Sequence, residues 1–262
     1  MFISELFIYP VKSCAGVRVD HLFFDSDGPR GDRRFVITDP AGDFITQRET
    51  PKMAHIQPVL TEASLQLSFE SDISPLVSLP VIGGDSRVRV WSDEVAGVDC
   101  GDDIALWLSE LLEKECRLKV LPEDNKRRAD TNYAPDNVGV SYADGFPLLV
   151  IYQASLDVLS AEAGVAVAAA RFRPNIVVTD AGDAFSERSW TRLSGEAGEL
   201  LIVKPCERCV IPLRDPVTLE RTKEVQQALV HHCRIDGKII FGQNAVFGGE
   251  MLSVGMTLNP ED

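Results

Sequence analysis

Long apolar runs are missing from this chain of 262 residues. No stretch approaches the ~20 apolar residues that a membrane-spanning helix needs, so a helical membrane protein is not expected. The opening residues, Met1–Leu6, also lack a basic region followed by an apolar core, which argues against a signal peptide. We therefore expect a cytoplasmic protein without a membrane partner.

Basic residues are few, since 26 Lys and Arg stand against 40 Asp and Glu, for a net charge of −14. A phosphate backbone requires a basic face, so nucleic acid is not an expected partner. The content of 45% hydrophobic and 25% charged residues is ordinary for a globular protein. In so acidic a chain, basic residues gathered at one place would indicate a site for one anion.

Cysteine is limited to six residues, and one pair alone is closely spaced. In a cytoplasmic protein of this length, reduced thiols are more common than disulfides. A zinc ribbon needs a second close pair, which the sequence lacks. A plant-type ferredoxin module needs four cysteines with a C-x₄-C-x₂-C run, and no such run occurs, so we expect no iron–sulfur cluster in this chain.

The close pair is Cys206 and Cys209, with Arg208 between them. From spacing alone it is half of a zinc site, a redox pair, or two buried cysteines that act as small hydrophobic residues. A thioredoxin-type pair should open a helix, whereas this one follows a predicted strand and lies between Pro205 and Pro212. The charge of Arg208 between them makes it less favourable to bury both thiols, which weakens the third alternative.

A second source of metal ligands is the run His231-His232-Cys233. It lies in or beside a predicted helix, where consecutive side chains point in different directions. The run could supply ligands to a zinc site with Cys206 and Cys209, but these directions make that arrangement unfavourable.

The pattern of β-branched and aromatic residues between turn residues predicts many short strands. The predicted strands are Ile3–Tyr9, Val17–Phe24, Arg34–Thr38, Ile56–Leu60, Ser64–Phe69, Arg87–Trp91, Phe146–Tyr152, Ile176–Thr179, Leu200–Lys204, Lys238–Phe241 and Ser253–Leu258. Helices are predicted after a cap at Asp102 or Asp103, over Ala154–Ala163 and over Thr222–His231. The polar segment Glu123–Asp136 is expected to be a mobile loop near a domain boundary. The chain is therefore β-rich α+β with few helices.

Several basic residues lie at the ends of predicted strands. Lys12 follows the first strand, Arg33 and Arg34 begin the third, and Arg173 precedes the strand at Ile176. A barrel presents its mouth at strand ends, so these residues could share one anion pocket. Each alone is more simply a solvated charge.

Four motifs in this order carry a family resemblance. They are Tyr9-Pro10-Val11-Lys12-Ser13-Cys14-x-Gly16, Gly31-Asp32-Arg33-Arg34-Phe35, Arg173-Pro174-Asn175-Ile176-Val177 and Cys206-x-Arg208-Cys209. Together they resemble the MOSC family, named for the C-terminal domain of molybdenum cofactor sulfurase, and within it the subgroup of the mitochondrial amidoxime-reducing component and its bacterial relatives. The resemblance implies an N-terminal β-barrel domain over residues 1–121, packed with a MOSC β-barrel over residues 122–262.

The resemblance also implies a molybdenum cofactor, whose metal is held by a pterin dithiolene, oxo groups and one cysteine, here Cys209. A thiolate is a soft ligand that a metal keeps deprotonated. Cys206 would be a neighbour of the metal. The residues implied to hold the pterin and its phosphate are Lys12, Ser13, Arg34, Asp144, Arg173 and Asn175.

The activity implied by the resemblance is reduction of small N-hydroxylated compounds, such as hydroxylamines, amidoximes and N-hydroxylated bases, to their amino forms, which is a detoxification reaction. The fused ferredoxin domain and the membrane anchor of some relatives are not found here, so a separate ferredoxin- or flavin-type protein would supply electrons. The alternatives are a sulfur or cofactor carrier that uses Cys209, and a β-barrel that binds a phosphate-bearing ligand without redox chemistry.

Overall fold

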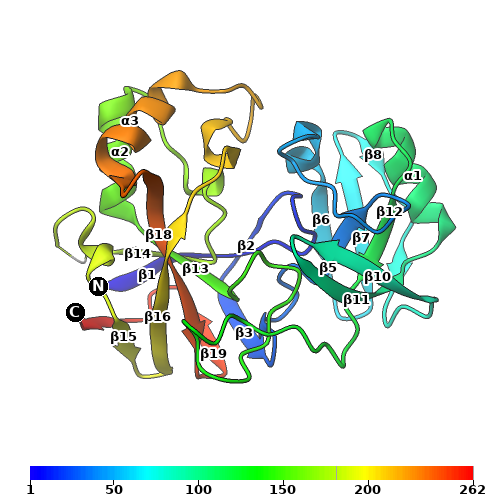
Figure 1. Cartoon of the computed structure of the whole chain (residues 1–262), viewed down its shortest axis with the longest axis horizontal. Coiled ribbons are helices and arrows are strands. Elements are labelled where there is room, and N and C mark those ends of the chain that lie inside the picture. Colours follow the sequence, from blue (N-terminus) through cyan, green and yellow to red (C-terminus); the bar gives the residue numbers. More distant parts are fainter. Residues whose placement is uncertain (181, 262) are drawn as a thin grey trace.

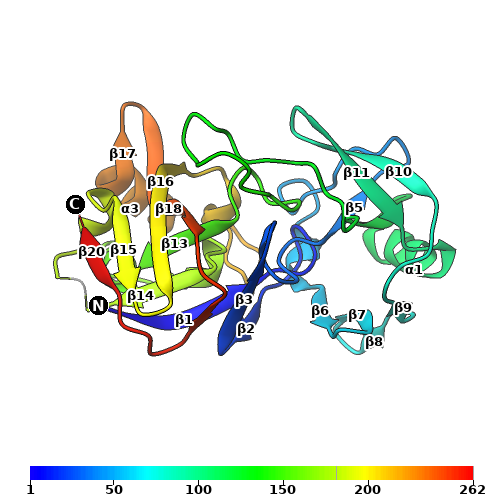
Figure 2. The same ribbon diagram turned by 90° about the horizontal axis from the view of Figure 1, so that it is seen from below.

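The computed structural model describes residues 1–180 and 182–261 and has two lobes side by side (Figures 1 and 2). The large lobe holds most of the C-terminal half, and the small lobe holds most of residues 30–120. None of the helices among the described residues has the length and apolar character that a membrane crossing requires. Three α-helices and many short strands confirm the predicted β-rich α+β class for the described part of the chain.

The elements have the following bounds. The strands are β1 (Phe2–Ile8), β2 (Val17–Val19), β3 (His21–Asp25), β4 (Gly28–Pro29), β5 (Phe35–Thr38), β6 (Gln57–Leu60), β7 (Ser64–Phe69), β8 (Asp72–Ile73), β9 (Val77–Ser78), β10 (Asp85–Val90), β11 (Asp93–Asp99), β12 (Arg117–Val120), β13 (Leu148–Tyr152), β14 (Ile176–Thr179), β15 (Arg192–Gly195), β16 (Gly198–Glu207), β17 (Arg234–Ile235), β18 (Lys238–Phe247), β19 (Met251–Ser253) and β20 (Asn259–Glu261). The helices are α1 (Asp102–Leu112), α2 (Gln153–Ala163) and α3 (Lys223–Cys233), with short 3₁₀ turns η1 (Pro51–His55), η2 (Ala169–Arg171), η3 (Ser186–Arg188) and η4 (Ile211–Leu213).

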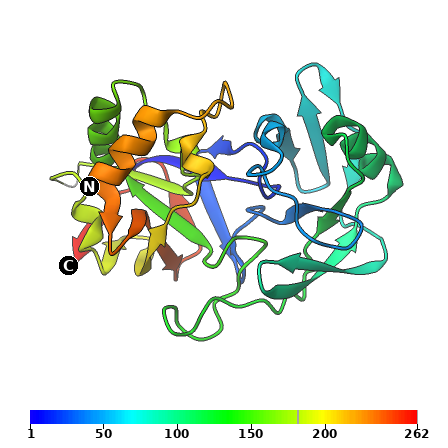
Figure 3. The ribbon, with the colours of Figure 1, turned by 45° about the horizontal axis from the view of Figure 1, so that its top comes forward.

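The large lobe is built on one sheet with the strand order β2-β1-β14-β13-β18-β16-β15-β20. Strands β13 and β14 are parallel and are joined through α2, whereas β1 runs antiparallel to β14. The apolar side chains on one face form a core that includes Leu6, Val150 and Leu193. On the other face α2 and α3 lie side by side over the sheet (Figure 3).

Two N-terminal strands, β1 and β2, belong to this sheet although they are distant from most of it in sequence. Strand β1 pairs with β14, whereas β3 pairs with β19 in a separate sheet ordered β19-β3-β4. Ile3, Leu6 and Leu22 are fully buried in the core of the large lobe. The expected division into residues 1–121 and 122–262 stays a prediction, but strand pairing crosses it.

The small lobe has two four-stranded sheets, one ordered β10-β11-β12-β5 and the other β6-β7-β8 with β9 beside β7. Helix α1 covers their shared core with Ile104, Leu108 and Leu112. The predicted aspartate cap is wrong, because the helix is capped by Gly101 and no side chain caps it. Asp102 and Asp103 lie instead in the first turn, where carboxylates interact favourably with the helix dipole.

The strand predicted near the C-terminus is also wrong. A strand was predicted over Ser253–Leu258, but β19 ends at Ser253 and a turn follows. Gly255 has a φ of 84°, in the left-handed region, which ends the extended conformation. The segment Glu123–Asp136 contains no helix or strand, as predicted.

The crossing of β1 into the large lobe predicts that residues 122–262 do not fold alone. That fragment would leave the β1 edge of β14 unpaired and would lack Ile3, Leu6 and Leu22 from the core. We expect no cooperative thermal transition by circular dichroism for the fragment, and recovery of a transition when residues 1–121 are co-expressed as a separate chain. A cooperative transition of 122–262 by itself would contradict this.

Candidate functional site

A cavity of about 400 Å³ lies where the two lobes meet. Its wall includes Gln47, Arg48 and Trp91 from the small lobe, and Arg208 and Cys209 from the segment that follows β16. The remaining lining residues that matter below are Lys12, Ser13, Arg33, Asp144, Arg173, Asn175, Cys206 and Glu207. Segments that are far apart in sequence therefore meet at one place.

The cavity is cationic in an acidic protein. Its charged lining residues are five basic side chains, Lys12, Arg33, Arg48, Arg173 and Arg208, and two acidic ones, Asp144 and Glu207. The whole chain has a net charge of −14. A concave wall of one sign focuses the electrostatic potential, so this geometry favours an anionic ligand.

A tyrosine ring organises two of the arginines. The guanidinium carbon atoms of Arg33 and Arg173 lie 4.4 Å and 4.2 Å from the centroid of the Tyr9 ring. Burial raises the pKa of Tyr9 to about 12, so the ring stays neutral and its face attracts both cations. Burial lowers the pKa of Arg173 to about 10, which still leaves it charged at neutral pH. Gly16 allows this arrangement, because a Cβ there would come within 2.5 Å of the ring.

Asp32 and Asn175 fix the arginines in position. The carboxylate of Asp32 accepts from the backbone N–H of Tyr9 at 2.8 Å and from Arg33 at 2.5 Å. The amide oxygen of Asn175 accepts from Arg33 at 3.1 Å and from the backbone of Leu149 at 3.2 Å. Both side chains are almost fully buried, so these bonds satisfy groups that burial would otherwise leave unpaired.

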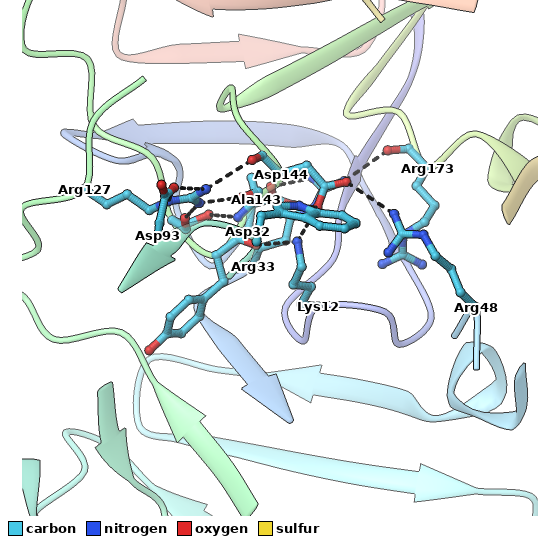
Figure 4. A network of polar contacts seen from close by, with 12 residues as sticks. Lys12, Asp32, Arg33, Arg48, Asp93, Arg127, Ala143, Asp144 and Arg173 are labelled. Atoms are coloured by element: carbon cyan, nitrogen blue, oxygen red, sulfur yellow. Dashed lines mark hydrogen bonds and ion pairs between the residues drawn. The ribbon is translucent and has the colours of Figure 1, made fainter. Parts of the chain in front are cut away.

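Lys12 and Asp144 form an ion pair inside the cavity (Figure 4). The Nζ of Lys12 lies 2.5 Å from Asp144 Oδ1 and donates to the carbonyl of Tyr142 at 2.7 Å. Burial lowers the pKa of Lys12, although Asp144 raises it in part. Burial raises the pKa of Asp144, but Lys12, Arg48 and the indole N–H of Trp91 outweigh it, so the net pKa is below the usual value.

Arg127 holds the loop that carries Asp144. Its guanidinium donates to the carbonyls of Ser141, Ala143 and Asp144, and it pairs with Asp93 of β11 (Figure 4). The loop is therefore tied to β11 of the small lobe. A pocket carboxylate supported in this way keeps its position better than one on an unsupported loop.

Four of the lining residues have a left-handed backbone. The φ values are 70° at Ser13, 47° at Arg33, 56° at Trp91 and 56° at Arg173. This region is disfavoured for residues other than glycine, and such strain is concentrated at functional sites. The clustering of these four strained residues indicates a functional site at the cavity, independently of its charge.

The cysteines differ sharply in accessibility. Cys209 is exposed and Cys206 is half-buried, and both line the cavity. Arg208 donates to the Sγ of Cys206 at 3.0 Å. Burial raises the pKa of Cys14 to about 12 and that of Cys233 to about 11, which makes these thiols poor nucleophiles and poor ligands. Cys209 is the exposed thiol among the described residues.

Six of the seven site residues predicted from the sequence line this cavity: Lys12, Ser13, Asp144, Arg173, Asn175 and Cys209. Arg34 does not. Its guanidinium donates to Asp27 at 3.0 Å and to the carbonyl of Leu121 at 3.1 Å, away from the pocket. The left-handed φ of Arg33 turns the chain so that Arg33, not Arg34, reaches the cavity.

Sequence reasoning missed Gln47, Arg48, Trp91 and Arg127. They belong to the small lobe or to the irregular loop, and no local pattern distinguishes them from other polar residues. In the described part of the chain, the buried Nε2 of Gln47 and Nε of Arg208 have no hydrogen-bond partner. Both residues line the cavity, so these atoms are donors available to a ligand.

The fold and the cavity define a class: a two-lobed β-rich protein with a cationic pocket and an exposed thiol at the junction. Two family models match the chain, the MOSC N-terminal beta barrel domain over residues 1–115 and the MOSC domain over residues 137–258. The chain belongs to the family of MOSC-domain proteins.

Named relatives agree with this assignment. The chain is 30% identical to mitochondrial amidoxime-reducing component 1 of Mus musculus, over 94% of this chain and 76% of that protein. It is 31% identical to molybdenum cofactor sulfurase of Drosophila persimilis, over 84% of this chain and 30% of that protein. Among solved structures, the YUAD protein of Bacillus subtilis aligns with 95% of this chain and 92% of its own at 12% identity and a TM-score of 0.40, which adds nothing to the assignment.

The cation cluster predicts anion binding that depends on Arg173. Inorganic pyrophosphate should bind in the cavity, and Arg173→Met should weaken binding about tenfold to a hundredfold, the effect of one lost charge-assisted hydrogen bond. Isothermal titration calorimetry measures this. Arg34→Met is the matched control, because Arg34 lies outside the cavity and its loss should leave the affinity unchanged. An equal loss of pyrophosphate affinity in both variants would contradict the role of Arg173 in anion binding.

The Lys12–Asp144 pair predicts a pH-dependent contribution to stability. The pKa of Asp144 is lower in the folded than in the unfolded chain, so its stabilisation is present above about pH 4 and is lost as the pH falls further. Asp144→Asn should lower the free energy of unfolding at pH 7 by about 1 kcal/mol, because the carboxylate is partly exposed. Urea unfolding at pH 7 and pH 3 should show the difference shrinking at pH 3. The exposed Asp124→Asn serves as control, and a difference that persists unchanged at pH 3 would contradict the prediction.

Proposed function

We propose that this protein is a cytoplasmic, molybdenum-cofactor-dependent oxidoreductase that reduces N-hydroxylated compounds to their amino forms. The observation that carries the proposal is the position of the exposed Cys209 thiol on a cavity lined by five basic side chains. The named relatives, amidoxime-reducing component and molybdenum cofactor sulfurase, support the cofactor and the reaction class.

The residues of the cavity fit such a cofactor. A pterin phosphate needs cationic and N–H donors, and the wall offers Arg173, Arg48 and the unpartnered donors of Gln47 and Arg208. A soft metal needs a thiolate, and Cys209 presents an exposed thiol on the cavity wall.

In this proposal Cys209 supplies the metal ligand, and Lys12, Ser13 and Arg173 bind the pterin and its phosphate. Arg33 takes the place in the cavity that the sequence had assigned to Arg34. The amide of Asn175 is already bonded to Arg33, Leu149 and Phe7, so it positions the arginine. The bound cofactor would supply two-electron, oxygen-atom chemistry.

The proposed reaction consumes two electrons and two protons for each N–O bond cleaved and releases water. The cavity has room for a small substrate, and the side chain of Asp144 on its wall is 63% exposed to solvent. The electrons would come from a separate donor protein of ferredoxin or flavin type.

A carrier of sulfur or of the cofactor is a second candidate. It is favoured by the exposure of Cys209, since a persulfide handed to another protein must be reachable. The likeness to molybdenum cofactor sulfurase also supports it. A carrier would release cyanide-labile sulfur or cofactor, whereas a reductase would turn over substrate.

The two cavity cysteines should differ in function. In protein made in a host that synthesises the cofactor, Cys209→Ala should lose most of the bound molybdenum and at least about a hundredfold of the amidoxime reduction rate. Cys206→Ala is the matched control. It should keep the metal, and its amidoxime reduction rate should fall about tenfold or less, as expected of a residue that lies beside a metal ligand without binding the metal. Elemental analysis and turnover by chemically reduced protein measure both.

Two results would overturn the reductase proposal. One is molybdenum and activity retained in Cys209→Ala. The other is wild-type protein that holds molybdenum but reduces no amidoxime or hydroxylamine and instead releases cyanide-labile sulfur, which would favour the carrier.

A further inference from the structure

Outside the cavity, two helices of the large lobe bring together three metal-ligating side chains. Glu162 lies in the last turn of α2, and His231 and His232 lie in the last turn of α3. One donor atom from each residue lies within 4.8 Å of the other two. The helices lie side by side in Figures 1 and 3, so the cluster bridges them.

The donor spacing matches a tetrahedral metal ion. A zinc ion with ligands at about 2.0–2.1 Å places tetrahedral donor atoms about 3.3 Å apart. The Nδ1 of His231 lies 3.0 Å from Glu162 Oε1, and the Nε2 of His232 lies 3.6 Å from Glu162 Oε2. These contacts use different oxygens of Glu162, and the three donor atoms lie within 4.8 Å of one another, so side-chain rotation is needed to bring them to the ligand spacing.

The surroundings hold His232 in position. Its ring stacks on Phe185 with centroids 5.6 Å apart and planes 13° apart. Its carbonyl accepts from Arg188 at 2.7 Å. The Nε2 atom is buried and has no hydrogen-bond partner among the described residues, while it faces Glu162. A ring nitrogen that its neighbours hold in place and that makes no hydrogen bond suits metal ligation.

The two histidines are close enough to act together. The centroids of their imidazole rings are 4.5 Å apart, and both rings lie beside one carboxylate. A divalent cation binds imidazole in its neutral form. Although consecutive side chains of a helix point in different directions, Glu162 approaches both rings here.

We propose that Glu162, His231 and His232 bind a divalent transition metal ion, with zinc as the best fit. Three protein ligands leave a fourth position for water. The ion would fasten the end of α2 to the end of α3 over the core that both helices cover. The proposal is independent of the cavity and of the molybdenum chemistry.

Zinc titration of the full chain tests the site. Isothermal titration calorimetry should show one zinc-binding event that Glu162→Gln and His231→Ala each weaken at least tenfold. The matched control is His21→Ala, which removes an exposed histidine of β3 and should leave this event unchanged. Thiols are common to all variants, so the difference between variants isolates this cluster from Cys206 and Cys209.

Thermal unfolding gives a second measurement, because a ligand that binds the folded state raises the melting temperature. Zinc should raise it in wild type and in His21→Ala, but by much less in Glu162→Gln, whose side chain is isosteric. Absence of a zinc-binding event, or equal affinity and equal thermal shift in wild type and Glu162→Gln, would overturn the proposal.

Discussion

The site depends on one buried arrangement, in which the Tyr9 ring receives two guanidinium groups at about the same distance. Two like charges would normally repel in a poorly hydrated place, but the ring face attracts both and Asp32 neutralises one. The three segments that meet here come from the end of β1, the loop before β5 and the loop before β14. Because Arg33 is engaged by Asp32 and Asn175, Arg173 keeps most of its donors for a ligand.

This arrangement also explains why a strongly acidic protein offers an anion pocket. Arg173 and Arg208 are held by aromatic rings, carbonyls and a thiol, so carboxylates do not cancel their charge locally. Arg48 lies over Trp91 at 4.7 Å, and Arg208 bonds a carbonyl and a thiol. The exceptions are Asp32, which pairs with Arg33, and Asp144, which pairs with Lys12. Asp144 lies on the loop that Arg127 ties to β11.

The sequence predicted the strands best where β-branched residues are continuous, as in Ile176–Thr179, whose bounds match β14. Six of the seven residues that the family resemblance implied line the cavity, most of them in motifs next to strand ends. Sequence reasoning failed between Arg33 and Arg34, since neighbouring arginines differ only in a backbone angle that no residue type encodes. It could not place Arg48 and Trp91, because only packing of the small lobe against the large lobe brings them to the cavity.

The pairing of β1 with β14 sets the geometry of the site. Phe2 and Ile3 pair with Thr179 and Val178, but Glu5 and Leu6 pair with Val177 and Ile176, so β1 holds one extra residue near Ser4. Continued along the chain, the shifted register places Phe7 beside Asn175, as their 2.9 Å backbone bond shows, and Tyr9 beside Arg173. Without the bulge every later side chain of β1 would move by one residue and change face. The ring that holds the arginines would then point elsewhere, so the cavity is fixed by strand register before any ligand binds.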